Sequence, residues 1–195
     1  ANPTTDQLEE KLAVLEKSEA CIAFASGMAA TTGLLLGHLS MGDHLVMCNT
    51  NYPGTAEVAR HTLTRFDIEM TPVDATDPAN VAGALRPETR MVWIETPSNP
   101  LLNISDIAAI AGITRAHGAL LVVDSTFATP IATRPIELGA DLVERVSLQV
   151  AVAAQGSCAV RGLRRRRQAT LCRSRDRGAR WQWRQGGRAS RARHH

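Results

Sequence analysis

The sequence has few cysteines and no apolar run long enough to cross a membrane. Its four cysteines, at positions 21, 48, 158 and 172, are widely spaced and form no C-x-x-C pair. This spacing argues against a disulfide scaffold or zinc site and favours a reducing compartment, so we expect a cytoplasmic protein. No stretch of about 18 apolar residues occurs, and we expect no membrane-spanning helix. The N-terminus lacks an initiator Met and a signal-peptide pattern, and we expect a fragment of a longer protein.

Lysine is absent after residue 17, and the balance of charge changes abruptly near residue 144. Residues 1–143 carry 8 basic and 17 acidic side chains, a net charge of −9. Residues 144–195 carry 14 arginines and only two acids, Glu144 and Asp176, a net charge of +12. We therefore divide the chain into a domain at residues 1–143 and a basic tail at residues 144–195.

Short apolar runs alternate with helical patterns in the first part. Strands are predicted at 20–25, 44–48, 68–73, 91–95 and 120–124, and helices at 28–39, 55–63 and 106–117, with a capping box at Thr4 and a helix start at Asp77-Pro78. This alternation predicts an α/β fold with a largely parallel sheet covered on both faces. We expect the strand beginning at Asp141 to be cut short, later strands to be missing, and residues 155–195 to be largely unstructured.

Two of the predicted strand ends are followed by the start of a helix. Parallel sheets bind ligands at the carboxyl ends of their strands. At Ser26-Gly27-Met28 the free N–H groups of a helix start could hold a phosphate, although an ordinary strand-to-helix turn has the same pattern. Tyr52, the only tyrosine, precedes another helix start and could equally be a packing residue.

Two further strand ends carry carboxylates. Glu95 is followed by Thr96-Pro97-Ser98-Asn99-Pro100, a stiff loop that presents Asn99. Asp124 ends a wholly apolar strand, where a carboxylate needs a hydrogen-bonding or cationic partner. Asp124 is therefore either a helix N-cap or the counter-ion of a protonated ring nitrogen or a metal. A phosphate site, a flat aromatic side chain and a buried aspartate together suit pyridoxal 5′-phosphate (PLP).

Several motifs occur in order along the first part. They are Asn2-Pro3-Thr4, Ala25-Ser26-Gly27-Met28, Gly42-Asp43-His44, Tyr52-Pro53-Gly54-Thr55, Glu95-Thr96-Pro97-Ser98-Asn99-Pro100, Val123-Asp124-Ser125-Thr126-Phe127 and Leu138-Gly139-Ala140-Asp141-Leu142-Val143. In wording, order and spacing they resemble the trans-sulfuration (Cys/Met metabolism) family of PLP enzymes. Its members include cystathionine γ-lyase, cystathionine γ-synthase and methionine γ-lyase.

The resemblance implies a fold, an assembly and a first set of roles. The fold is the large domain of fold-type I PLP enzymes, here truncated, and the assembly is a homotetramer. The substrate is a small amino acid, either a sulfur amino acid or a homoserine derivative. The N–H groups of Gly27 and Met28 are implied to grip the cofactor phosphate. Tyr52 is implied to stack on the ring and to assist proton transfer.

The remaining implied roles belong to residues at the other strand ends. Asp124 is implied to pair with the ring nitrogen and keep it protonated. Asn99 is implied to hydrogen-bond the 3-oxygen of the ring, and Thr126 to lie near the ring. Glu95 is implied to hold these residues in position without contacting the cofactor itself.

The chain departs from the family after Val143. Family members continue with a His-Ser-x-Thr-Lys segment whose lysine forms the Schiff base with the cofactor, whereas this chain reads Glu144-Arg145-Val146-Ser147-Leu148-Gln149-Val150. Its only lysines, Lys11 and Lys17, lie in the first predicted helix. Arginine cannot replace the amine because it stays protonated. We therefore expect no covalent attachment of the cofactor and no completed reaction.

Three explanations of residues 144–195 compete. A reading-frame slip near codon 144 accounts for the abrupt change from acidic to basic, the loss of lysine and the onset inside a family motif. A basic tail that binds nucleic acid would use its arginines on phosphates and Trp181 and Trp183 on bases. A catalytically dead structural partner is the third. We favour the slip and expect no binding of nucleic acid.

Overall fold

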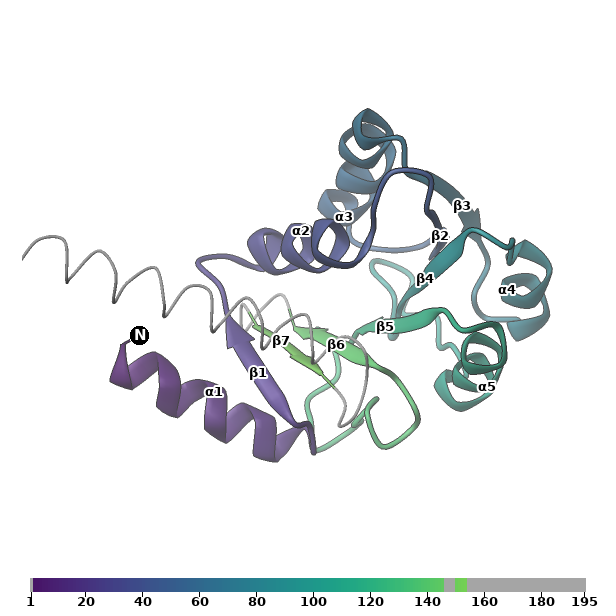
Figure 1. Cartoon of the computed structure of the whole chain (residues 1–195). Coiled ribbons are helices and arrows are strands. Elements are labelled where there is room, and N and C mark those ends of the chain that lie inside the picture. The colour runs from purple at the N-terminus through teal and green to yellow at the C-terminus, as the bar shows by residue number, and fades with distance from the viewer. Residues whose placement is uncertain (1, 146–149, 154–195) are drawn as a thin grey trace, which may run out of the picture.

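A computed structural model describes residues 2–145 and 150–153 of the chain. These residues form a seven-stranded sheet in the order β1-β7-β6-β5-β4-β2-β3 (Figure 1). The strands are β1 (Ala20–Ala23), β2 (His44–Cys48), β3 (Glu69–Val73), β4 (Thr89–Glu95), β5 (Leu120–Asp124), β6 (Leu142–Arg145) and β7 (Val150–Ala153). Strands β3, β2, β4, β5 and β6 pair in parallel, whereas β7 is antiparallel to both of its neighbours. The α/β fold with a largely parallel sheet is confirmed.

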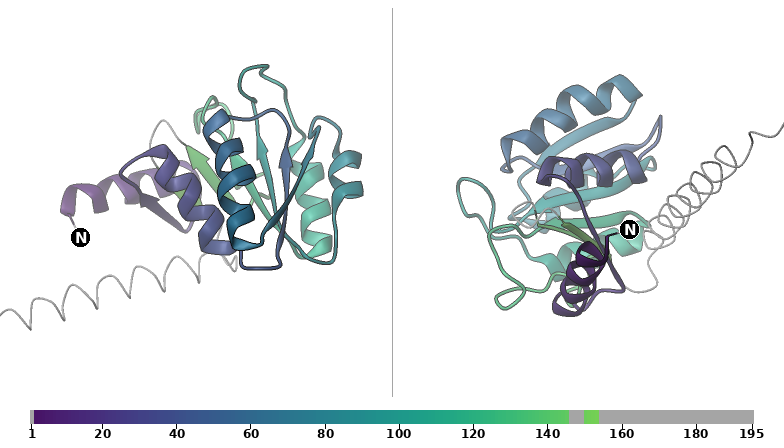
Figure 2. Two further views of the ribbon diagram at one scale, coloured as in Figure 1. Left: turned by 90° about the horizontal axis from the view of Figure 1, so that it is seen from above. Right: turned by 90° about the vertical axis from the view of Figure 1, so that its left-hand side faces the viewer.

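Helices cover both faces of this sheet (Figure 2). They are α1 (Pro3–Leu15), α2 (Gly27–His38), α3 (Pro53–Glu57), α4 (Pro78–Ala84) and α5 (Ile107–His117). Helices α2 and α3 lie on one face, and α1, α4 and α5 lie on the other. After α3 the chain continues as a π-helical turn, η1 (Val58–Thr62), and a 3-10 turn, η2 (Leu63–Phe66), where the sequence predicts one continuous helix.

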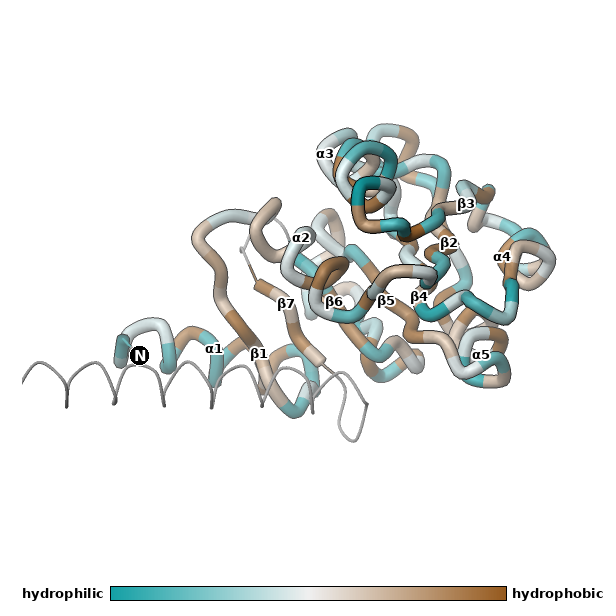
Figure 3. Tube along the Cα trace, turned by 45° about the horizontal axis from the view of Figure 1, so that its top comes forward, coloured by the Kyte–Doolittle hydropathy of each residue, from teal (hydrophilic) through white to brown (hydrophobic). Residues whose placement is uncertain are grey.

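The central strands are buried on both faces. In β4, Val92 and Ile94 pack in the core beneath α5, whereas Met91 and Trp93 pack in the core beneath α2. A strand covered on both sides needs apolar residues at consecutive positions, which is why residues 91–94 of β4 and 120–123 of β5 are unbroken apolar runs (Figure 3). A side chain that ends such a strand therefore emerges at the rim of the core.

The helix ends follow the capping residues of the sequence, with one correction. Asp106 and Asp77 cap α5 and α4, and Gly118, with φ of 87°, ends α5. The cap of α1 is Asn2, whose side chain accepts a hydrogen bond from the Thr4 N–H, so the predicted capping box at Thr4 is wrong. Pro3 has no N–H and suits the first helical position, which moves the cap to the residue before it.

The sheet extends past Val143, contrary to the expectation that its later strands are missing. Leu142–Arg145 forms β6, and Val150–Ala153 forms β7, which fills the gap between β6 and β1. The side chains of β7 alternate between the two cores: Val150 and Val152 face one, and Ala151 and Ala153 face the other. A short apolar segment whose side chains pack against the cores on both faces of a sheet can add a strand to it, even if the segment does not belong to the family sequence. Residues 155–195, expected to lack structure, lie outside the described residues.

Candidate functional site

Three carboxyl side chains stand in a row at the carboxyl ends of neighbouring strands. Glu95 of β4 is the register partner of Asp124 of β5, and Asp124 is the partner of Glu144 of β6. Register partners in a parallel sheet point to the same face, about 4.8 Å apart. Here that face is the one beneath α2, and all three residues are buried. We call Glu95, Asp124 and Glu144 the carboxyl row.

Asp124 is held by the turn that follows β5. Its Oδ1 accepts hydrogen bonds from the Thr126 N–H at 3.0 Å and the Thr126 hydroxyl at 2.5 Å. Burial raises the pKa of Asp124, while the two bonds from Thr126 and the positive charge of Arg145 lower it. The structure thus brings Thr126 and Asp124 into direct contact at the end of β5.

Glu95 connects two loops of the site. Its Oε2 accepts the N–H of Tyr52 at 2.6 Å, and the N–H of Asn99 also bonds to its carboxylate. Burial and the charge of Asp124 raise the pKa of Glu95 to about 7. The Glu95 N–H in turn donates to the sulfur of Cys48, and burial raises the pKa of that thiol to about 12, so the thiol stays protonated.

Tyr52 and the start of α2 approach each other at Gly54. A Cβ atom at Gly54 would lie 2.6 Å from Cε1 of Tyr52 and 2.8 Å from the sulfur of Met28, so only glycine fits there. Ser26 caps α2 by accepting the Ala29 N–H at 3.1 Å. The N–H groups of Gly27 and Met28, in the first turn, have no acceptor within the helix.

Glu144 is a site residue that the sequence analysis missed. Its Oε1 accepts a 2.7 Å hydrogen bond from the hydroxyl of Thr31 on α2, and that hydroxyl lies 3.3 Å from the carbonyl oxygen of Gly27. Burial and the charge of Asp124 raise the pKa of Glu144 to about 9. A carboxylate three residues after the predicted strand start at Asp141 was itself a signal, and the division at residue 143 hid it.

Arg145 lies next to the carboxyl row and points away from it. Its buried guanidinium pairs with Glu16 after α1 and bonds to the carbonyl oxygens of Ser125 and Ala128. A third bond, of 3.3 Å, reaches the carbonyl oxygen of Thr133. Arg145 therefore fastens the loop after β5 to α1.

Neither lysine reaches the carboxyl row. Lys11 and Lys17 are exposed, on α1 and just after it. The N–H of Glu19 bonds to the carbonyl oxygen of Ala153, which pairs with Leu142 at the start of β6. The chain leaving α1 therefore enters the sheet at the edge opposite to the carboxyl row.

The residues that the sequence assigns to PLP fit non-covalent binding of that group. The start of α2 suits a phosphate, and Asp124 is a buried carboxylate that no basic side chain contacts within the described residues. The close approach at Gly54 keeps Tyr52 beside the same helix end. Covalent attachment does not fit, because residues 18–195 contain no lysine.

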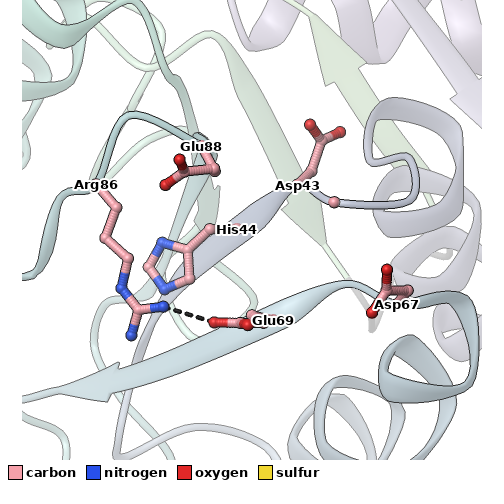
Figure 4. A pocket seen from close by; sticks show the side chains of 7 residues that line it. Asp43, His44, Asp67, Glu69, Arg86 and Glu88 are labelled. Carbon is pink, nitrogen blue, oxygen red and sulfur yellow. Dashed lines mark hydrogen bonds and ion pairs between the residues drawn. The ribbon is translucent and has the colours of Figure 1, made fainter.

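A polar pocket lies at the amino ends of β2, β3 and β4 (Figure 4). It is lined by Gly42, Asp43, His44, Asp67, Glu69, Arg86 and Glu88. The basic groups in it are engaged: Arg86 pairs with Glu69 at 2.6 Å, and the His44 ring nitrogens bond to the hydroxyls of Thr89 and Thr71. Burial lowers the pKa of His44. The basic groups of this pocket, at the edge opposite to the carboxyl row, are thus already engaged with protein partners.

Two classes of site receive no support from the described part of the chain. No group of three or more His, Cys, Asp or Glu side chains there is arranged to hold a metal ion. No helix among residues 2–145 and 150–153 has the length and hydropathy needed to span a bilayer.

Comparison with known proteins gives a consistent match over the first three quarters of the chain. The model of the Cys/Met metabolism PLP-dependent enzyme family matches residues 1–147. L-methionine gamma-lyase of Treponema denticola is 45% identical over 144 residues, and cystathionine gamma-lyase of Bacillus subtilis is 46% identical over 143. Both alignments cover 73% of this chain, but only 36% and 38% of those proteins, so the chain spans little more than a third of their length.

Solved structures agree with the sequence matches. The metB protein of Corynebacterium glutamicum has a TM-score of 0.76 and 37% identity, and cystathionine gamma-lyase of Lactobacillus plantarum, complexed with L-serine, has 0.74 and 38%. Each comparison covers 80% of this chain and 43% of the other. Most of this chain thus shares the fold of these proteins.

Proposed function

The chain belongs to the Cys/Met metabolism family of PLP-dependent enzymes, and from this premise we propose that it is the cofactor-binding part of a trans-sulfuration enzyme. The substrate would be a sulfur amino acid or a homoserine derivative, and the reaction a γ-elimination or γ-replacement. The names of its relatives, a methionine gamma-lyase, a cystathionine gamma-synthase and a cystathionine gamma-lyase, support this class. We also propose a cytoplasmic homotetramer, which sedimentation of the purified protein tests.

The observation that carries this proposal is the convergence of the predicted residues at one edge of the sheet. Glu95 holds the backbone of Tyr52 and Asn99, Asp124 is held by Thr126, and α2 begins beside Tyr52. The contacts of Tyr52 with Glu95 and with the start of α2 join three strand-end segments that are far apart in the sequence, and the register of β4 and β5 puts Asp124 beside Glu95. A ligand with a phosphate, an aromatic ring and a protonated ring nitrogen matches the helix start, the tyrosine and the aspartate in turn.

Each residue then has a role in binding or in moving a proton. PLP, when bound, supplies an aromatic ring that accepts electrons from the substrate. The N–H groups of Gly27 and Met28 bind its phosphate, and the carboxylate of Asp124 keeps a proton on the ring nitrogen. The ring of Tyr52 limits the mobility of the bound ring, and its hydroxyl assists proton transfer. Asn99 and Thr126 orient the ring from the loops.

We further propose that the chain as written does not complete the reaction. A lysine amine has to hold the cofactor and to move the proton at the substrate α-carbon. Lys17 is near the opposite edge of the sheet, and Lys11 is exposed on α1, which covers the face of the sheet away from the carboxyl row. The carboxyl row offers acids, but no amine in the described residues approaches it.

A reading-frame slip near codon 144 is our proposal for the origin of residues 144–195. The family match ends at residue 147 of 195, close to the change in charge and composition. Translation of the gene in its other two frames is expected to give a His-Ser-x-Thr-Lys-like segment after codon 143. If neither frame contains it, the slip is excluded, and salt-sensitive binding of nucleic acid would favour the basic tail instead.

Equilibrium dialysis against PLP tests the cofactor-binding role. The wild-type chain and the matched surface variant Glu10→Gln are expected to bind equally, and Asp124→Asn to bind about tenfold more weakly because the partner of the ring nitrogen is neutral. Treatment with borohydride is expected to trap no cofactor at the site, and peptide mapping locates any attachment. Equal affinity of the wild type and Asp124→Asn, or no binding at all, contradicts the proposal.

A further inference from the structure

Glu144 lies between two parts of the candidate site. On one side its Oε1 accepts the hydrogen bond of Thr31, one turn after Gly27 in α2. On the other side it is the register partner of Asp124. Its carboxyl group therefore stands between the helix start that suits a phosphate and the aspartate that suits a ring nitrogen.

One oxygen of Glu144 has no hydrogen-bond partner among the described residues. Oε2 is buried without a hydrogen bond in the described part of the chain, and the residue has no exposed surface. Asp124 and Glu95 are the charged groups that approach it from β5 and β4, while β7 presents Ala151 and α2 presents Thr31. The neighbouring guanidinium of Arg145 is turned to Glu16. Glu144 is thus a buried acid with two acidic neighbours and a free oxygen.

We propose that Glu144 and Asp124 form a two-carboxyl seat for the cationic ring nitrogen of a bound, phosphate-bearing heteroaromatic ligand, and that Glu144 loses its proton when this ligand binds. The inference rests on the proposed cofactor-binding role and adds a binding residue to it. Glu144 directly follows Leu138-Gly139-Ala140-Asp141-Leu142-Val143, the last motif by which the chain resembles its family, and the inference concerns this residue of this chain.

The electrostatics of the carboxyl row explain why Glu144 holds a proton without ligand and loses it when a cation binds. Three carboxylates so close together cannot all be ionised without a compensating positive charge, because each disfavours the charge of the next. Burial and Asp124 raise the pKa of Glu144 to about 9, so the row holds a proton there at neutral pH. A cation placed against Asp124 reverses this effect and favours the ionised form of Glu144.

The proton balance follows from these states. Without ligand, Glu144 carries its proton on a carboxyl oxygen and Asp124 is the ionised member of the pair. When the cation binds, the O–H bond of Glu144 breaks, the proton passes to solvent, and the electron pair stays on the carboxylate. No oxidant, reductant or further reactant is needed.

Calorimetric titration with pyridoxamine 5′-phosphate tests the inference. This ligand has the phosphate and the ring but no aldehyde, so it cannot react with Lys11 or Lys17. The heat is measured at pH 8 in two buffers of different ionisation enthalpy, which gives the number of protons released per bound ligand. The wild type is compared with Glu144→Gln, which keeps the shape of the side chain, and with Glu10→Gln, the same change on the surface of α1.

The wild type and Glu10→Gln are expected to release about one proton more per bound ligand than Glu144→Gln, because a group with a pKa near 9 is about nine-tenths protonated at pH 8. Equal proton release in all three proteins overturns the role of Glu144 and leaves the cofactor-binding proposal intact. Absence of binding in the wild type overturns both.

A second measurement tests the same inference in the wild type alone, without the variant Glu144→Gln. Carbon-13 NMR of glutamate carboxyls in the wild type is expected to show one glutamate that titrates above pH 8 in the free chain. In the complex the same signal is expected to titrate at least one pH unit lower. A signal that titrates at the same pH with and without ligand contradicts the inference.

Discussion

The backbone N–H of Tyr52 donates a 2.6 Å hydrogen bond to the carboxylate of Glu95, 43 residues away. This bond places the only tyrosine of the chain at the start of α3, above the end of β4. Its side chain makes no cap for the helix, so the position of Tyr52 depends on its backbone and on Glu95.

Replacement of Glu95 by leucine is expected to lower the free energy of unfolding by about 2 kcal/mol, because the N–H groups of Tyr52 and Asn99 lose their acceptor. Glu95→Gln keeps one acceptor oxygen and is expected to cost about half as much. Urea denaturation of the three proteins measures the difference. The bond is unimportant if both variants unfold at the wild-type midpoint.

Removal of Arg145 alone is expected to destabilise the chain more than removal of Arg145 and Glu16 together. Arg145→Met leaves Glu16 buried without its cation and is expected to destabilise the chain by about 3–5 kcal/mol. The double variant Arg145→Met with Glu16→Leu is expected to recover part of that loss. A double-mutant cycle by urea denaturation gives the coupling, and additive losses would contradict a direct pair.

Glu144 is expected to make stability fall as the pH rises. Its folded-state pKa, about 9, lies above the value of 4.5 of an ordinary glutamate, so between these values the folded state holds a proton that the unfolded state has lost. The free energy of unfolding therefore decreases by up to ~1.4 kcal/mol per pH unit over this window.

The variant Glu144→Gln is expected to remove that slope, whereas Glu10→Gln is expected to keep it. Denaturation midpoints measured from pH 5 to pH 9 provide the test. Glu95, with a pKa of about 7, adds a slope of the same sign over a narrower pH window, which ends near neutrality in all three proteins. Parallel curves for wild type and Glu144→Gln would show that Glu144 ionises normally.

His44 is expected to act in the opposite direction at acid pH. Burial lowers its pKa below the usual 6.5, so below pH 6.5 the unfolded state takes up a proton that the folded state does not. Stability therefore falls as the pH drops from 6.5 through the folded pKa. His44→Gln is expected to reduce this loss of stability below pH 6.5, measured as the denaturation midpoint at each pH.

The partner of His44 provides a separate test of the same network. The hydroxyl of Thr89 lies 2.8 Å from Nδ1 of His44 and accepts the N–H of Arg86 at 2.8 Å. Thr89→Val is expected to cost about 1–3 kcal/mol at any pH, because it leaves buried polar groups without partners. Thermal denaturation at pH 8 measures this loss without the contribution of histidine protonation.

The order of strands and helices follows from local patterns in the sequence. Apolar runs such as His44–Cys48 and Leu120–Asp124 are buried on both faces and match the predicted strands residue for residue. The helix start at Asp77-Pro78 is confirmed, and the cap of α5 at Asp106 and its end at Gly118 are likewise local choices of backbone hydrogen bonding. The motifs likewise predicted the family and its cofactor without any coordinates.

Only the tertiary structure decided which distant groups meet. The register of β4, β5 and β6 puts Glu95, Asp124 and Glu144 in one row, and the crossing of α2 puts Thr31 against Glu144. Register depends on how whole strands pack between two layers of helices, and a change of composition at residue 144 does not disclose it. The placement of β7 and the burial of Arg145 depend on the same packing, because both fill space that other elements leave.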